Sequence, residues 1–208
     1  MIPEFDVTAE IDCDLDTLRT DLTAEDVADG FTEHHEYECM GLPSWDEASE
    51  CAAEEASLLS DAEKSDAPDG VTAFLDELIE TDDVGHAELM AYTFNHNDPG
   101  VAGLSMALNA ARIVTFYSCS AGRNHHADYP MVGSVPDRAR AELLLGLLRK
   151  SGCGVGQTYG RWYIYGPSIR HTHALANAII SSREAFDALP PPPWTTDLKE
   201  VLEERDEF

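Results

Sequence analysis

A short polar segment near the middle of the chain holds most of the residues whose types could do chemistry. Residues 117–126 read Tyr-Ser-Cys-Ser-Ala-Gly-Arg-Asn-His-His. Its hydroxyls and the backbone amides around the glycine can donate to an anion, and the arginine offers a planar fork for phosphate or carboxylate. The candidate ligand-binding residues are Ser118, Cys119, Ser120, Arg123, His125 and His126.

Three other interpretations of this segment stay open. Cys119, His125 and His126 are zinc-ligand types, with Asp128 as a fourth, but adjacent histidines rarely both reach one ion and the spacing matches no standard zinc pattern, so we assign no metal ligand. Cys119 could instead be a nucleophile whose pKa is lowered by Arg123 and a histidine. A polar loop whose serines cap backbone groups is the third interpretation. The catalytic residues and any cofactor therefore remain unknown.

A second histidine pair lies further along the chain. His171 and His173 fall on a predicted helix, where residues two apart point about 200° away from each other. We therefore do not expect these two side chains to bind one metal ion.

The elements around the polar segment predict an α/β fold. Residues 113–119 are apolar and β-branched, as in a buried strand, and open sheets bind ligands beyond their strand ends. From residue 89 we predict the order β-α-β-β-α-β-β-α, whose first six elements match a ferredoxin-like pattern. The prediction is a two-layer α+β sandwich with an extra hairpin strand and a final helix. Its strands and hairpin are expected at residues 89–94, 113–119, 129–135, 155–158 and 161–165.

Local signals define several element ends. Asp98 and Pro99 predict the start of the first helix, and Gly152 predicts the end of the second. A two-residue turn at Tyr159 and Gly160 predicts the hairpin, and Ser168 is expected to cap the final helix.

Residues 109–123 resemble the wybutosine-synthesis tRNA methyltransferase family. That family has a strand running into a Ser-Ser-Cys-Ser-Gly-Arg loop, and the matching residues here are Tyr117-Ser118-Cys119-Ser120-Ala121-Gly122-Arg123. The resemblance covers residues 89–180. It implies an S-adenosylmethionine-dependent enzyme acting on RNA, with the site near these residues. The chain departs from the family in the inserted alanine, in tyrosine for the first serine, and in its acidity.

The charge of the chain is strongly segregated. The net charge is −27. Residues 1–88 hold 28 acids against 2 bases, whereas residues 89–189 hold 6 acids against 9 bases. So much like charge repels itself unless a basic surface or salt lies nearby.

The acidic region is predicted to be helical. Apolar positions at Ile11, Leu15, Leu18 and Leu22 have helical spacing, Thr23 and Asp26 mark a helix start, and Ser44 with Glu47 forms a capping box. The helix after Ser44 is expected to bury Trp45, Ala48, Ala52, Ala56 and Leu59, and another helix is expected at residues 71–79.

These patterns divide the chain into three parts. We predict an acidic helical region at residues 1–85, an α/β domain at 86–190, and a proline-rich exit with an acidic tail at 191–208. The proline run stops the last helix and stiffens the exit.

The composition excludes several classes of protein. No apolar run approaches the roughly 20 residues of a membrane span, and the N-terminus lacks the features of a signal peptide. The 5 cysteines lie far apart without a CxxC pair, which favours reduced thiols. We therefore expect a cytoplasmic protein that does not contact membranes.

Two functions fit the sequence. The first is a binding or regulatory protein, such as an inhibitor or immunity protein, whose acidic helical arm docks a basic protein or mimics nucleic acid. The alternative is a nucleotide- or RNA-directed enzyme that uses residues 118–126, with a phosphate-containing small molecule or RNA as its ligand. Whether the chain is an enzyme stays open.

Overall fold

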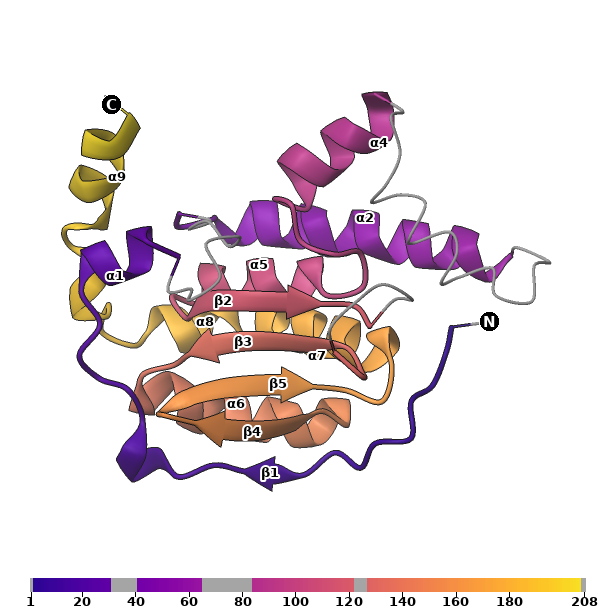
Figure 1. Ribbon diagram of the computed structural model, residues 1–208, viewed down its shortest axis with the longest axis horizontal. Helices are drawn as coiled ribbons and strands as arrows, with labels where there is room; N and C mark the ends of the chain where they lie inside the picture. The colour runs from indigo at the N-terminus through magenta and orange to yellow at the C-terminus, as the bar shows by residue number, and fades with distance from the viewer. Residues whose placement is uncertain (1, 31–40, 65–83, 122–126, 207–208) are drawn as a thin grey trace.

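The computed structural model describes residues 2–30, 41–64, 84–121 and 127–206, and its fold is an α/β sandwich as predicted (Figure 1). A five-stranded sheet has the order β1-β4-β5-β3-β2. Among the described strands, only the β1–β4 pair is parallel, and the other pairs are antiparallel. The strands are β1 (Ile11–Asp12), β2 (Val114–Cys119), β3 (Met131–Val135), β4 (Gly154–Thr158) and β5 (Arg161–Tyr165).

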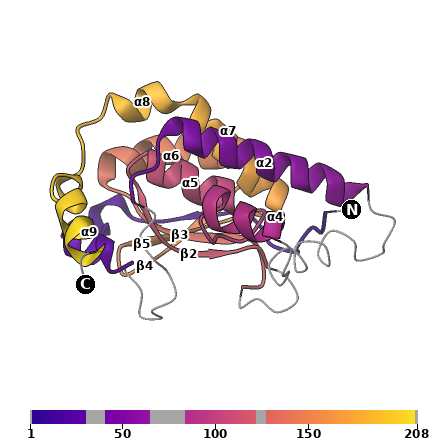
Figure 2. The same cartoon turned by 90° about the horizontal axis from the view of Figure 1, so that it is seen from above.

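Helices cover one face of the sheet (Figure 2). Against it lie α5 (Ala102–Ala110), α6 (Arg138–Ser151) and α7 (Ile169–Ser181), and α2 (Trp45–Glu63) packs on α5 and α7. The main core forms between the sheet and these helices, where Leu144, Trp162 and Leu175 are fully buried. All nine residues of α5 are buried because the sheet lies on one side of it and α2 on the other.

The opposite face of the sheet carries a smaller core built from both ends of the chain. Here α1 (Ala24–Ala28), η3 (Pro193–Thr195) and α9 (Leu198–Asp206) bring Val27, Trp194 and Leu198 against Val114 and Phe116 of β2. The proline-rich exit is thus part of a packed segment. The remaining elements are η1 (Leu15–Thr17), α4 (Val84–Glu88), η2 (Leu89–Thr93) and α8 (Arg183–Asp187).

Several predicted element ends are confirmed. Both capping boxes are present: Ser44 Oγ accepts from the Glu47 amide while the Glu47 carboxylate accepts from the Ser44 amide, and Thr23 does the same with Asp26. Gly152 ends α6 in the left-handed conformation at φ 69°. The β4–β5 hairpin turns at Tyr159 and Gly160, both with positive φ.

The strand predicted at residues 89–94 is wrong, and with it the first strand of the ferredoxin-like order. These residues continue α4 as a π-helical turn, in which the Phe94 amide donates to the Leu89 carbonyl at 3.0 Å. Phe94 is fully buried against Ala48 and Cys51 of α2. A short apolar run does not by itself distinguish a strand from a buried helical turn, and here contact with α2 decides it.

The predicted start of the first helix is also wrong. The helix α5 begins at Ala102 with Val101 as its N-cap, and no side-chain hydrogen bond caps it at that residue. The Asp98 carboxylate instead accepts from the amide and hydroxyl of Ser120, at 3.0 and 3.3 Å. The Asp98 side chain, which the local pattern predicted to cap the helix, therefore makes a tertiary contact with Ser120 instead.

The helix predicted at residues 11–22 is absent. The chain runs extended through the two-residue strand β1 and the short turn η1. Burial alternates from one residue to the next, as in a strand: Ile11, Cys13 and Leu15 are half-buried, whereas Asp12 and Asp14 are exposed. The helix predicted at residues 71–79 lies outside the described residues.

The boundary predicted near residue 85 does not separate two packing units among the described residues. Ala48 and Cys51 share one core cluster with Ala102 and Met106. From the sequence alone we predict that residues 86–190 fold independently, but these shared contacts favour the opposite expectation.

Candidate functional site

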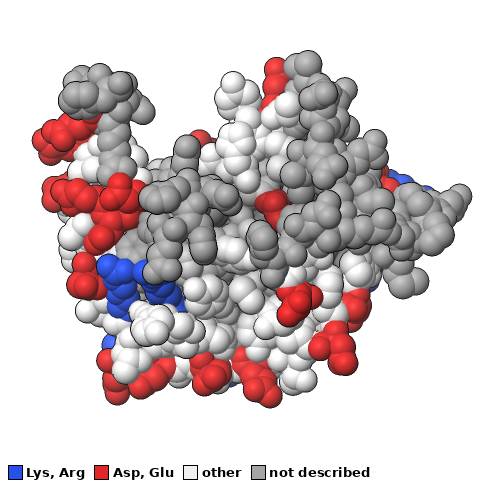
Figure 3. Space-filling model, viewed as in Figure 1, with Lys and Arg blue, Asp and Glu red and all other residues white. Residues whose placement is uncertain are grey.

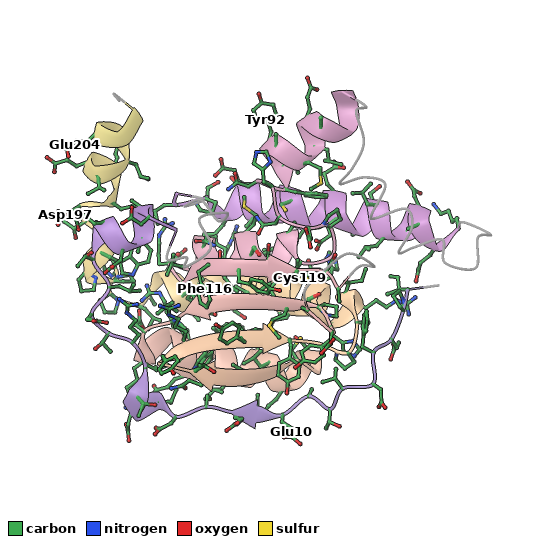
Figure 4. The ribbon with its side chains drawn as sticks, in the orientation of Figure 1. Glu10, Tyr92, Phe116, Cys119, Asp197 and Glu204 are labelled. Carbon is green, nitrogen blue, oxygen red and sulfur yellow. The ribbon has the colours of Figure 1, made fainter. Side chains whose placement is uncertain are left out.

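The polar loop after β2 is described only in part. Ser118 is half-buried, and Cys119 and Ser120 are buried at the end of the strand (Figure 4). Arg123, His125 and His126 lie outside the described residues. Of the six candidate residues, the structure thus places Ser118, Cys119 and Ser120 together at this strand end.

The donors of Ser120 already bind an anionic group of the same chain. Its amide and its hydroxyl both lie within hydrogen-bonding distance of Oδ2 of Asp98. A phosphate at this position would have to displace the Asp98 carboxylate and would be repelled by it. This contact weighs against anion binding at Ser120.

Cys119 is enclosed at the end of β2, next to Tyr117. Its side chain is 3% exposed. The pKa of the neighbouring Tyr117 is raised, first by burial and then by Cys119, Asp98 and Tyr163. None of these groups is a cation, and the proposed activators, Arg123 and a histidine, are not described. Among the described residues, no three His, Cys, Asp or Glu side chains are placed to hold a metal ion.

A buried carboxylate that the sequence prediction missed lies on α2. Glu55 is fully buried, and its Oε1 accepts from the amides of Gly100 and Gly103 at 2.8 and 3.3 Å. It thereby supplies, from another helix, the side-chain cap that α5 lacks. Its Oε2 lies 3.1 Å from Nδ1 of His173 on α7. Glu55 therefore ties α2 to α5 and α7 and has no exposed surface with which to meet a substrate.

The signal for Glu55 was in the helical spacing. It lies three residues after Ala52 and four before Leu59, both buried, whereas Ala56, predicted to be buried, is exposed.

The two histidines of the His171-Thr172-His173 segment have different neighbours. His171 contacts Ser168, and His173 contacts Glu55.

The acidic region displays its charge mainly along an extended segment, residues 2–16, called here the N-terminal strap. Apolar side chains alternate with acids along most of it, with a break at Thr8 and Ala9, and Ile11, Cys13 and Leu15 pack against the main core. The acids are exposed, and Glu10 lies at the outer edge of the sheet (Figure 4). The exposed acids of the strap are Glu4, Asp6, Glu10, Asp12, Asp14 and Asp16.

The strap is held to the sheet edge by specific contacts. Tyr165 reaches over Gly154 so that its hydroxyl accepts from the Glu10 amide and donates to the Thr8 carbonyl, each at 3.2 Å. A Cβ at residue 154 would lie 2.4 Å from Cζ of Tyr165, so this approach requires glycine. The Val155 amide donates to the Glu10 carbonyl at 2.8 Å.

A second anchor lies at η1. The Gln157 side chain accepts from the Asp14 amide at 3.0 Å and donates to the Asp14 carbonyl at 3.1 Å. Next to it, an open pocket of about 440 Å³ lies between the strap and the β4–β5 turn. Its lining residues are Asp12, Cys13, Asp14, Thr17, Gln157, Tyr159 and Gly160.

Acidic side chains gather along the β1 edge and over α1 and α9 (Figure 3). A few basic residues neutralise part of this charge: Arg138 pairs with Asp16, and Arg19 pairs with Asp26 of α1. No described hydrogen bond or ion pair reaches the carboxylates of Glu4, Asp6 or Glu10. Most of the strap's charge is therefore open to a partner.

No described helix is long and apolar enough to cross a membrane. Comparison of the chain with protein-family models, with curated proteins and with solved structures found no match. The resemblance to the wybutosine-synthesis methyltransferases at residues 117–123 thus remains a prediction.

Proposed function

We propose that the chain is a binding protein whose N-terminal strap docks a basic protein surface in the manner of a nucleic-acid strand. The observation that carries this proposal is the alternation along the strap: except around Thr8 and Ala9, half-buried side chains alternate with exposed carboxylates. Side chains two residues apart on an extended chain are about 6.6 Å apart. Such a row of negative charges, interrupted only at Thr8, resembles the phosphates of a single strand.

The row is fixed before a partner arrives. Contacts from Tyr165, Val155 and Gln157 hold the strap's backbone, so docking would cost little conformational entropy. Neighbouring carboxylates repel each other by about 0.6 kcal/mol per pair in water, and a basic partner would relieve this repulsion. Both effects favour binding to a cationic surface.

An enzyme that uses residues 118–126 has less support. Asp98 occupies the Ser120 donors that such a site would need for phosphate. The acidic edge would also repel RNA.

A labelled peptide of alternating arginine and serine, long enough to follow the strap, tests the proposal. Fluorescence anisotropy should show an affinity that falls on the order of tenfold or more between about 50 and about 500 mM NaCl, because screening weakens contacts between exposed charges. The triple variant Glu4→Gln, Asp6→Asn, Glu10→Gln should lose most of the binding.

A matched control removes the same charge elsewhere. Asp46→Asn, Glu50→Gln, Glu54→Gln changes three exposed acids of α2. Glu47 is left intact because it caps α2, and Glu55 because it is buried. This control should bind nearly as well as the unchanged chain. Equal losses in the two triple variants, or no binding at low salt, would overturn the proposal.

A further inference from the structure

We infer that the pocket between the strap and the β4–β5 turn receives one arginine side chain of the basic partner. This inference rests on the proposed function and specifies its anchor point. The pocket lies along the row of carboxylates and is lined by two of them, Asp12 and Asp14. Its volume of about 440 Å³ is ample for a single long side chain.

The hydrogen-bonding groups that line the pocket favour a ligand that donates hydrogen bonds. Both hydrogens of the Gln157 amide are used, one on the Asp14 carbonyl and one on Thr17 Oγ1 at 2.8 Å. The Thr17 hydroxyl in turn donates to the Asp14 carbonyl at 3.2 Å. Apart from the Cys13 thiol and the Tyr159 hydroxyl, the side-chain donors of the wall are thus already satisfied.

The acceptors of the wall remain open. The Asp12 carboxylate accepts no described hydrogen bond. The Asp14 carboxylate accepts from the Asp16 amide through Oδ1, and its Oδ2 has no described partner. A ligand that brings several donors and a positive charge matches this wall, whereas an anion would meet two carboxylates and few donors.

An exposed aromatic ring at the rim distinguishes guanidinium from ammonium. Tyr159 is 93% exposed at the first position of the hairpin turn. A guanidinium can stack on such a ring while its N–H groups reach a carboxylate in two parallel hydrogen bonds. A lysine ammonium is more strongly hydrated and cannot form the paired geometry.

The pKa of the Cys13 thiol, which lines the pocket, reflects the negative charge around it. The pKa of Cys13 is raised by its partial burial and then by the charges of Asp12 and Asp14, while Arg149 on α6 acts in the opposite direction. A cation placed in the pocket would be stabilised by the same two carboxylates. This agrees with the inventory of donors and acceptors.

A scan of the peptide used above tests the inference. Each arginine is replaced in turn by lysine, which keeps the charge, and binding is measured at about 50 mM NaCl. One position, the anchor, should lose about threefold to tenfold in affinity, and the other positions should change less than about twofold. In Tyr159→Ala that difference should vanish, whereas Tyr159→Phe should retain it because the ring face remains.

The outcomes separate this inference from the proposed function. If the peptide binds with the expected salt dependence but every position tolerates lysine equally, the arginine pocket is wrong and the charged strap stands. The pocket is also wrong if the anchor effect persists in Tyr159→Ala. If no peptide binds at low salt, both fail. Tyr159 is exposed, so its variants should fold normally, which circular dichroism would verify.

Discussion

The Glu55 carboxylate lies 3.1 Å from Nδ1 of His173, and it joins the acidic helix α2 to α7 in a buried position. The same carboxylate receives the Gly100 and Gly103 amides at the start of α5. One acid of the N-terminal region is thus a structural element of the α/β fold.

We expect Glu55→Ala to lower the free energy of unfolding by about 3 kcal/mol, because the amides of Gly100 and Gly103 would be left buried without an acceptor. Glu55→Gln keeps an acceptor and should cost less. Urea unfolding measures both. The control is Glu54→Ala on the exposed face of α2, which should change stability by less than about 0.5 kcal/mol. Equal effects at the two positions would show that the buried contact is unimportant.

Gly154→Ala should loosen the strap. The new methyl group would push the Tyr165 ring away, and the ring's hydroxyl would lose its hydrogen bonds to Thr8 and Glu10, at a cost of about 2 kcal/mol. Hydrogen exchange at the Glu10 amide should become faster. Gly156→Ala, two residues along the same strand, is the control, because a Cβ there meets no atom within 4 Å. Unchanged exchange in Gly154→Ala would contradict the proposed clamp.

Stability should fall in alkaline solution. Burial raises the pKa of Cys153 to about 12, and burial together with Glu55 raises that of Cys51. An unfolded thiol loses its proton near pH 8.5 while the folded thiols keep theirs, so the unfolded state binds fewer protons above that pH. Stability should therefore decline above about pH 8.5, by up to about 1.4 kcal/mol per pH unit for each thiol.

Urea unfolding between about pH 7 and about pH 9.5 measures this decline, below the pKa of about 10 at which unfolded tyrosines titrate. Cys153→Ala should reduce the slope because it removes one of the two thiols. A slope that stays the same in this variant would assign the alkaline effect to other groups.

Residues 86–190 expressed alone should not melt cooperatively. The fragment would expose Ala102 and Met106, which pack against α2, and would lack the strand at the β4 edge. We expect helical circular dichroism without a sharp thermal transition, as in a molten globule. The complete chain serves as the control. A cooperative transition in the fragment would instead support the boundary predicted near residue 85.

Features determined by neighbouring residues could be predicted from the sequence. The capping boxes at Thr23 and Ser44, the end of α6 at Gly152 and the turn at Gly160 each depend on a few consecutive residues. The buried strand β2 and the α/β class followed from the runs of apolar residues between these signals.

Features determined by distant contacts could not be predicted in this way. The extended strap depends on Tyr165 and Gln157, more than 140 residues away. The π-helical turn before Phe94 depends on packing against α2. At the candidate loop, the hydrogen bond from Ser120 to Asp98 joins residues 22 positions apart, and no local sequence pattern predicts it.

The pairing of β1 with β4 has a consequence for synthesis on the ribosome. The strand β1 cannot pair until residues 154–158 have been synthesised. Likewise, α1 cannot pack until α9 has been synthesised. Such late closure of distant contacts slows folding and leaves early segments exposed. The dense negative charge of those first residues would keep the nascent chains apart during that delay. The acidic strap would thus also limit association of the chains until residues 154–158 are available to pair with it.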